Sequence, residues 1–294
     1  MRRVKFIYNP HSGEGRIIRS LDKIIDIYQS AGYLPEPFRL DGGQTPDIAL
    51  RDVSPATHDH LLIAGGDGTV GQTVNAMNAL GLSIPVGLLP TGTANDFARC
   101  LGMPHKISDA CRRILHSTPT PIDIGSANGR RFVNVAGAGL FTDVSQKTSP
   151  NLKQAIGKLA YYLKGLETLQ RIRSIPMRIT ADGNRFEGDT YFLLVLNGRT
   201  AGRIRFAPKA NITDGKLDLL IIRAMPVIEL LPLFIRILNG ESVESNRVLR
   251  MRAADITVDC DSLDATDLDG EPGPTFPIHI RCLPGALRVK GYTP

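Results

Sequence analysis

The stretch Leu61-Leu62-Ile63-Ala64-Gly65-Gly66-Asp67-Gly68-Thr69 joins an apolar run to a glycine-rich turn, and an amphipathic segment from Val70 to Leu80 follows it. A short, continuous apolar run is typical of a buried parallel strand, so the stretch predicts strand, turn and helix. The helix N-terminus would direct backbone N–H groups and a positive dipole end toward a ligand, and phosphate suits that position. The three glycines leave room for a phosphoryl group, and the threonine adds a hydroxyl donor.

Asp67 is the unusual member of this turn. A carboxylate beside a polyphosphate is repelled unless a divalent cation or a substrate proton lies between them. Asp67 therefore indicates metal-assisted chemistry. The alternative is that Asp67 only caps the helix that follows, and the turn by itself leaves both interpretations open.

The chain has 294 residues and a hydrophobic content of 42%, which suffices for two domains that each have a core. Its formal net charge is +6, without a run of Lys and Arg that would indicate a nucleic-acid-binding arm. This balance favours weak attraction to anionic surfaces. The four cysteines are scattered, so we expect reduced thiols and a cytoplasmic protein.

No segment is expected to span a membrane. The N-terminus runs directly into a strand without a long apolar signal region. The richest apolar run, Ile228 to Leu238, is interrupted by Pro232 and Arg236.

The first part of the chain alternates strands and helices, which predicts an α/β domain with a largely parallel sheet. Strands are expected at Val4–Tyr8, Pro37–Leu40, Leu61–Ala64 and Ile84–Leu89, and helices at Ile17–Tyr28, Pro46–Val53, Val70–Leu80 and Ile107–Ser117. Three of the strands end in loops of small polar residues. Such loops gather at the carboxyl edge of a parallel sheet, so Ser12, Asp67 and Thr93 are expected around one cavity.

The pattern changes near residue 121, where Pro119 and Pro121 precede short alternating strands. We expect a second domain that is largely antiparallel β, with hairpins at Asn128-Gly129 and Asp182-Gly183-Asn184. Further strands are expected at Leu217–Ile222, Val248–Cys260 and Phe276–Cys282, and two helices at Leu152–Ile172 and Val227–Leu238.

The second part also contains an acidic loop, Asp264 to Glu271. Pro272 favours an extended conformation for Glu271, which would aim its side chain. A carboxylate held in this way can take a proton from a substrate hydroxyl. The alternative is a solvated acidic turn.

Taken together, the chain resembles the diacylglycerol and sphingosine lipid kinases, especially their soluble bacterial branch. Five motifs in the same order carry the resemblance: Asn9-Pro10-His11-Ser12-Gly13, Gly65 to Thr69, Leu89 to Arg99, Asp214-Gly215-Lys216-Leu217-Asp218 and Asp269-Gly270-Glu271-Pro272.

The resemblance implies a two-domain kinase that uses ATP and Mg²⁺. The nucleotide-binding α/β domain would comprise residues 1–121, with 284–294 returning to it through a strand at Pro284–Val289. Residues 122–283 would form the β-rich lipid domain.

The resemblance also implies roles for single residues. Glu271 becomes the general base, and Asp67 and Asp96 lie near the catalytic magnesium and the phosphates. The nucleotide contacts are Asn9, Pro10, His11, Ser12, Gly13, Gly65, Gly66, Asp67, Gly68, Thr69 and Thr93.

A structural magnesium is implied at Asn211, Asp214 and Lys216, where only Asp214 offers a charged ligand and the others would use backbone oxygens. The family commonly has a basic residue directly after the glycine of the first loop, whereas this chain has Glu14, and Arg16 is the candidate substitute.

Two alternatives stay open: an NAD kinase, which shares the Gly-Gly-Asp-Gly turn and the two-domain plan, and a catalytically inactive nucleotide-binding regulator. The Thr91 to Arg99 motif argues against the first, and the retained acids argue against the second. For partners, we expect a lipid substrate, transient contact with the inner membrane surface and no nucleic acid. The lipid acceptor and a homodimer are left open.

Overall fold

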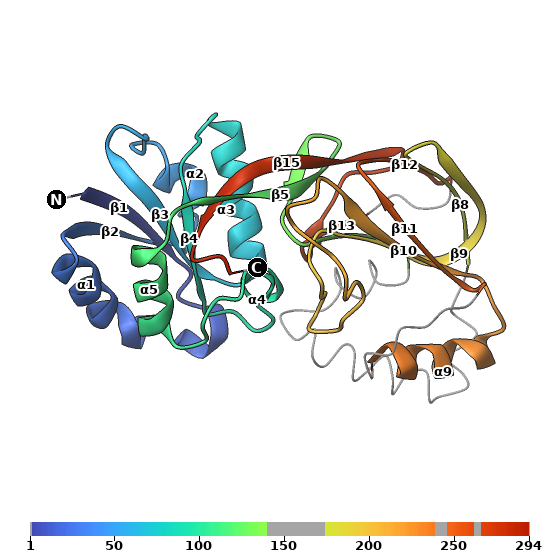
Figure 1. Ribbon diagram of the computed structural model, residues 1–294, viewed down its shortest axis with the longest axis horizontal. Helices are drawn as coiled ribbons and strands as arrows, with labels where there is room; N and C mark the ends of the chain where they lie inside the picture. Colours follow the sequence, from blue (N-terminus) through green and yellow to red (C-terminus); the bar gives the residue numbers. More distant parts are fainter. Residues whose placement is uncertain (1, 140–173, 239–245, 262–265, 294) are drawn as a thin grey trace. The chain divides into compact units, whose positions relative to one another are not determined.

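The computed structural model describes residues 2–139, 174–238, 246–261 and 266–293 (Figure 1). The helix predicted at Leu152–Ile172 lies outside these residues. The chain divides into two compact units, one of Met1–Asp123 with Gly285–Pro294 and the other of Ile124–Pro284. The predicted fold class is confirmed, because the first unit has a parallel sheet with helices and the second is dominated by antiparallel strands.

The sheet of the first unit is parallel, with the strand order β15-β4-β3-β1-β2. Its strands are β1 (Arg2–Tyr8), β2 (Tyr33–Arg39), β3 (His58–Gly65), β4 (Val86–Pro90) and the end of β15 (Ile278–Lys290). The second strand is longer than predicted and contains Pro35 and Pro37, which are tolerated because β2 lies at the sheet edge and needs ladder bonds on one side only.

Helices flank this sheet on both faces (Figure 1). α1 packs against α5, and α2 packs against α3. The helical segments are η1 (Ser12–Gly15), η2 (Ile18–Ser20), α1 (Leu21–Ser30), α2 (Pro46–Ala49), α3 (Asp67–Ala79), α4 (Asp96–Cys100) and α5 (Ile107–His116). Several predicted helix bounds need correction, and α2 ends at Ala49 and not at Val53. The first helix starts at Leu21 after two 3₁₀ turns, and α3 starts at Asp67 because Gly66 takes the extended N-cap conformation.

Two histidines of β3 are core residues. His58 is buried with Nε2 3.2 Å from Glu36 Oε2. His60 is buried with Nδ1 2.8 Å from Asp59 Oδ2 and Nε2 3.2 Å from the hydroxyl of Tyr28. The hydrogen bond from His60 and the charge of Lys290 hold the pKa of Asp59 at about 2, while burial lowers the pKa of His60. These contacts give both histidines a structural role.

The second unit is built mainly from antiparallel strands. They are β5 (Thr120–Ala127), which begins in the first unit, β6 (Arg130–Phe132), β7 (Val135–Gly139), β8 (Ile175–Ala181), β9 (Asn184–Leu196), β10 (Leu217–Arg223), β11 (Val248–Ala253), β12 (Asp255–Asp259), β13 (Asp267–Leu268), β14 (Glu271–Pro272) and the first part of β15. The hairpins predicted at Asn128-Gly129 and Asp182-Gly183 are present.

The predicted acidic loop needs correction, because its last residues form a third hairpin. β13 pairs antiparallel with β14, and the two-residue turn is Asp269-Gly270 with φ of +54° and +91°. Positive φ at both positions is typical of a type I′ turn, which Asp-Gly favours.

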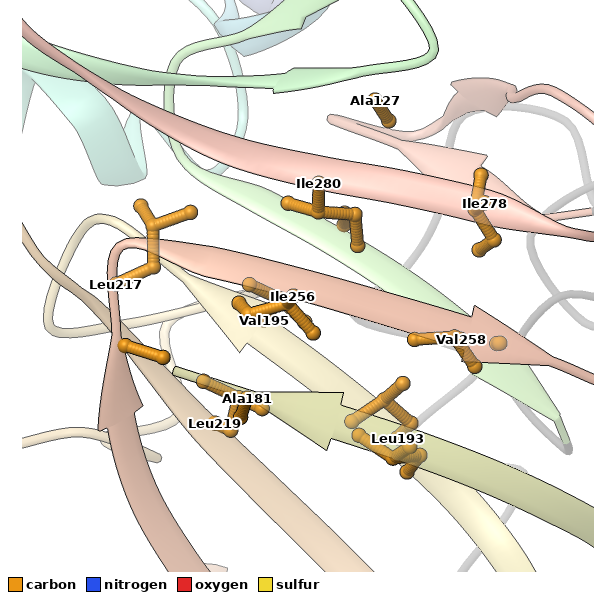
Figure 2. Close-up of a cluster of buried hydrophobic side chains, with 14 of the residues drawn as sticks. Ala127, Ala181, Leu193, Val195, Leu217, Leu219, Ile256, Val258, Ile278 and Ile280 are labelled. Atoms are coloured by element: carbon orange, nitrogen blue, oxygen red, sulfur yellow. The ribbon is translucent and has the colours of Figure 1, made fainter. Parts of the chain in front are cut away.

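The core of this unit forms where alternate residues of several strands face one another (Figure 2). Pairs two residues apart in a strand lie on the same face, as Ile256 and Val258 of β12 do. A second cluster includes Leu230, Leu233 and Ile237 of α9 (Val227–Leu238). In the described part of the chain, no helix is both long enough and apolar enough to cross a membrane.

Candidate active site

The strand order of the first unit marks where a ligand would bind. The chain runs from β1 outward to β2 and then crosses back to β3 on the other side of β1. In open α/β sheets the crevice beyond the carboxyl ends of the strands, at such a reversal, is the usual ligand site. The loops that follow β1 and β3 are Asn9–Gly13 and Gly65–Thr69, so two of the predicted motifs flank this position.

Backbone contacts bring the three predicted loops of this unit together. The N–H of Asn9 donates to the carbonyl of Ala64 (2.9 Å), and the side-chain amide of Asn9 lies 3.4 Å from Thr69 Oγ1. The N–H groups of Thr91 and Gly92 both donate to the carbonyl of Gly65 (3.3 and 3.2 Å). The loops after β1, β3 and β4 therefore share one edge of the sheet.

Two glycines make this close packing possible. A Cβ on Gly13, whose φ is +56°, would lie 1.9 Å from the carbonyl oxygen of Thr91. A Cβ on Gly92 would lie 2.3 Å from Cα of Gly66. Both distances are far inside van der Waals contact, so the loops can approach this closely only because these positions lack a side chain.

Asp67 links the second loop to the third. Its Oδ1 accepts a hydrogen bond from the N–H of Phe97 (2.9 Å) and its Oδ2 from the N–H of Asp96 (3.1 Å). Asp67 is the first residue of α3, yet these bonds cap α4. The alternative that Asp67 only caps its own helix therefore needs correction, because both of these bonds go to the helix of the neighbouring loop.

The electrostatics of Asp67 follow from its surroundings. Burial raises the pKa of the carboxyl above its usual value, the N–H of Phe97 opposes this effect, and the nearby charge of Asp96 raises the pKa further. Asp96 itself is buried. Two neighbouring carboxylates attract a hard cation that takes oxygen ligands, so the donor set fits Mg²⁺. In the described residues no three His, Cys, Asp or Glu side chains gather to hold a metal, so other oxygens, such as those of phosphates, would have to complete its coordination.

The turn that presents Asp96 depends on Asn95, which the sequence analysis missed as a positioning residue. Asn95 has φ of +53°, its Oδ1 accepts from the N–H of Gly92 (2.8 Å) and its Nδ2 donates to the carbonyl of Gly92 (2.7 Å). The available signal was the residue type, because Asn tolerates the left-handed conformation and bonds the local backbone.

The remaining predicted contacts of the first loop differ in exposure. Pro10 is buried and Ser12 is half-buried, while His11 is exposed with Nε2 3.4 Å from Asp41 Oδ1. The guanidinium of Arg16 donates to the carbonyl of Pro90 (3.3 Å) at the end of β4, which places a positive charge beside the loops. The side chain of Glu14 lies outside the described structure. In the third loop, Thr93 is exposed.

Glu271 lies in the second unit, at the start of β14, and is half-buried. It faces Leu268 across the short hairpin described above. The preceding turn and Pro272 give Glu271 an extended backbone, as the sequence predicts.

The loop predicted to hold a structural magnesium has its side chains already engaged. Oδ1 of Asn211 accepts from the N–H and the hydroxyl of Thr213 (3.2 and 2.9 Å). Asp214 accepts from the N–H of Lys216 (3.1 Å) and forms an ion pair with Arg252. Since Arg252 balances the charge of Asp214, a cation would have to share that carboxylate. The side chains of this loop therefore fit a magnesium ion poorly, and the structural magnesium site stays a prediction.

Comparison with known proteins agrees with both units. Residues 3–127 match the diacylglycerol kinase catalytic domain, and residues 134–291 match the YegS C-terminal NAD kinase beta sandwich-like domain. The chain is 33% identical to a diacylglycerol kinase of Bacillus subtilis over 94% of this chain and 92% of the relative. It is 31% identical to a diacylglycerol kinase of Staphylococcus carnosus over 100% of this chain and 95% of the relative.

A solved structure described as a diacylglycerol kinase from Bacillus anthracis has a similar fold. The TM-score is 0.78 at 26% identity, and the match covers 100% of this chain and 97% of that chain. The NAD kinase alternative is not favoured, because the unit that carries the three loops matches the diacylglycerol kinase catalytic domain.

Proposed function

Because the chain belongs to the diacylglycerol kinase family, a family of lipid kinases, we propose that it transfers the γ-phosphoryl group of ATP to a lipid hydroxyl, with a diacylglycerol-like acceptor. The observation that carries the proposal is the packing of the loops after β1, β3 and β4 around two neighbouring carboxylates. Phosphoryl transfer needs charge neutralisation and positioning more than covalent chemistry from the protein, and this loop edge offers both.

The first unit would bind the nucleotide. Backbone N–H groups at the start of α3 favour the phosphates. Asp67 and Asp96 would hold Mg²⁺, which when bound neutralises charge on the phosphates. Arg16 adds positive charge beside the same loops and is our candidate for the basic role that Glu14 cannot take.

Glu271 would act as the general base. The hydroxyl oxygen of the lipid forms a bond to the γ-phosphorus, the bond from that phosphorus to the bridging oxygen of ADP breaks, and the hydroxyl proton passes to the Glu271 carboxylate. The half-buried, extended setting of Glu271 supports this role. Glu271→Gln keeps the shape and removes the base, so turnover should fall about 100-fold or more.

The test is a kinase assay with labelled ATP and a panel of acceptors: diacylglycerol, monoacylglycerol, phosphatidylglycerol, a sphingoid base and NAD. Labelled product from a glycerolipid supports the proposal. Product from NAD alone would support the NAD kinase alternative, and ATP binding without product from any acceptor would support an inactive regulator.

We also propose that the protein meets its lipid by transient contact with a membrane surface, which its net charge of +6 supports. Sedimentation with vesicles should show binding that increases with anionic lipid and decreases with salt, because screening weakens such contacts. Binding that is indifferent to both would contradict the electrostatic contribution.

A further inference from the structure

The hairpin that carries Glu271 is held in place by a residue to which the proposed mechanism gives no role. Asp269 lies two residues before Glu271, in the left-handed conformation with φ of +54°. It forms the turn between β13 and β14 together with Gly270. The direction in which Glu271 leaves this turn therefore depends on how Asp269 is fixed.

The carboxylate of Asp269 receives three backbone hydrogen bonds from one stretch of chain. The N–H of Val133 donates to Oδ2 (2.7 Å), and the N–H groups of Asn134 and Val135 donate to Oδ1 (2.9 Å each). The N–H of Asp269 in turn donates to the carbonyl of Val135 (2.9 Å). Hydrogen bonds to an ionised carboxylate are roughly twice as strong as neutral ones, so the tip of the hairpin is firmly tied to residues 133–135.

The stretch that binds Asp269 is itself well anchored. Asn134 is buried, and its side-chain amide donates to the carbonyl of Thr200 (2.9 Å). The carbonyl of Asn134 accepts from the N–H of Asn197 (2.8 Å), whose side chain donates to the carbonyl of Val133 (2.9 Å). Asp269 thus docks the hairpin on a fixed part of the core.

The hairpin has further contacts besides those of Asp269: β13 pairs with β7 through Asp267 and Leu268, and the guanidinium of Arg130 donates to the carbonyl of Pro272. The N–H of Gly273 donates to the carbonyl of Thr266 (2.7 Å), and the hydroxyl of Thr266 donates to the carbonyl of Pro274 (2.7 Å). The N–H of Gly270 donates to Oδ1 of Asp267 (2.9 Å). These contacts hold the strands of the hairpin, and the carboxylate of Asp269 adds the three bonds that hold its turn.

We propose that Asp269 is a positioning residue for catalysis, which fixes the hairpin so that the Glu271 carboxylate has one orientation. The inference rests on the proposed role of Glu271 as base. Positioning has a large effect on rate, since a displacement of about 1 Å can cost about 100-fold.

The chain contains a matched control for this proposal. Asp182 forms an Asp-Gly turn of the same kind between β8 and β9, with φ of +45°. Its carboxylate accepts from the N–H groups of Ala254 and Asp255 (3.0 and 2.9 Å), and its N–H donates to the carbonyl of Asp255 (2.9 Å). The residue two positions later is Asn184, which has no proposed role in the reaction. Loss of Asp182 therefore removes backbone bonds of the same kind at a turn that carries no proposed base.

The experiment compares Asp269→Asn, Asp269→Ala and the same substitutions at Asp182, each alone and combined with Glu271→Gln. Asp269→Ala should lower kcat about 100-fold with unchanged KM for ATP, and Asp269→Asn should lower it less, because one oxygen can still accept the bonds from Asn134 and Val135. The Asp182 variants should stay within about twofold of the wild-type kcat. In the Glu271→Gln variant, adding Asp269→Ala should lower kcat by no more than about another twofold. The reason is that the effects of two residues on kcat do not add when one acts through the other.

Thermal unfolding of all variants shows whether the Asp269 and Asp182 substitutions cost similar stability, and Asp269→Asn tests the proposal if the alanine variant does not fold. Equal losses of kcat at Asp182 and Asp269 would overturn the inference, as would a full additional loss in the Glu271→Gln background. If Glu271→Gln itself turns over at the wild-type rate, the assignment of the base fails, which is a separate result.

Discussion

Asp67 offers the sharpest test of the proposed nucleotide site, because it combines a chemical role with a structural one. Its carboxylate caps α4 through the N–H groups of Asp96 and Phe97, and it also supplies negative charge where a metal would bind. The variant Asp67→Asn removes the charge but keeps one carbonyl oxygen as an acceptor.

The structural cost can be worked from these contacts. A hydrogen bond to a charged group contributes about 1.5–3 kcal/mol, and a neutral one about 1 kcal/mol. Asp67→Asn weakens one of the two hydrogen bonds to α4 and loses the other, but it also removes the cost of burying a charge. We therefore expect the free energy of unfolding to fall by about 2 kcal/mol. Asp67→Ala loses both bonds and should cost about 2–4 kcal/mol.

The chemical cost should be much larger than this loss of stability implies. Without its charge the site holds the metal and phosphates poorly, so turnover should fall at least about 100-fold although the protein stays folded. Asp182→Asn is the matched control. It makes the same substitution at a carboxylate that accepts from the N–H groups of Ala254 and Asp255 and has no proposed part in the reaction, so it should cost about 2 kcal/mol or less of stability but less than about twofold in turnover.

The assays are urea unfolding and phosphorylation of the accepted lipid at saturating ATP. Turnover of Asp67→Asn within about tenfold of wild type would refute the metal–phosphate role of Asp67 and reduce it to a cap of α4. A loss of turnover for Asp182→Asn as large as that for Asp67→Asn would refute the separation of the two roles.

Gly92→Ala should lower the free energy of unfolding by more than about 2 kcal/mol, because the new methyl group would lie 2.3 Å from the backbone of Gly66. Gly66→Ala, whose new methyl group would have its nearest contact at 3.4 Å, should cost less than about 1 kcal/mol. Urea unfolding of the two variants measures the difference. Asp59→Asn tests how protonation of Asp59 is coupled to stability. The hydrogen bond from His60 lowers the pKa of Asp59 from 3.8 in the unfolded chain to about 2 in the folded protein. The ionised Asp59 therefore stabilises the fold above pH 3.8, and this stabilisation is lost as the pH falls toward 2. After allowance for solvent screening, wild type should exceed the variant by about 1 kcal/mol at neutral pH, and equal stabilities there would contradict the prediction. Asp214→Ala should lower turnover but keep nucleotide affinity if its loop holds a structural magnesium, and full activity with unchanged magnesium dependence would leave only an ordinary turn.

Much of the first unit could be predicted because its signals are local. A continuous apolar run such as Leu61–Ala64 identifies a buried strand, and the rule that ligands bind at the carboxyl edge places the following loops together. The cap of α4 could not be predicted. Asp67 and Phe97 lie far apart in the sequence and meet only through the parallel pairing of β3 with β4.

The hairpin at Asp269-Gly270 was missed for a different reason. Its strands are two residues long and contain acidic residues, so hydrophobic alternation gives no signal and the charge pattern indicates a loop. The Asp-Gly dipeptide carried the correct information, as it did at Asp182-Gly183. A two-residue strand forms here because it adds to an existing sheet through β7.

Three Asx-Gly hairpin turns of the second unit, at Asn128, Asp182 and Asp269, show how the facing backbone selects the residue. At Asn128, the neighbouring strand offers the N–H of His279 (2.8 Å) and the carbonyl of Pro277 (3.0 Å), and an amide side chain can bond both. At Asp182 and Asp269, the side chain faces only backbone N–H groups. A carboxylate can accept a hydrogen bond from each of them. An amide in its place would point its own NH₂ donor at one of these N–H donors. The same turn geometry therefore takes Asn where donor and acceptor alternate and Asp where donors converge. By this reasoning the acid at position 269 is required by its setting on residues 133–135, and its proximity to Glu271 turns a local structural requirement into a means of orienting the base.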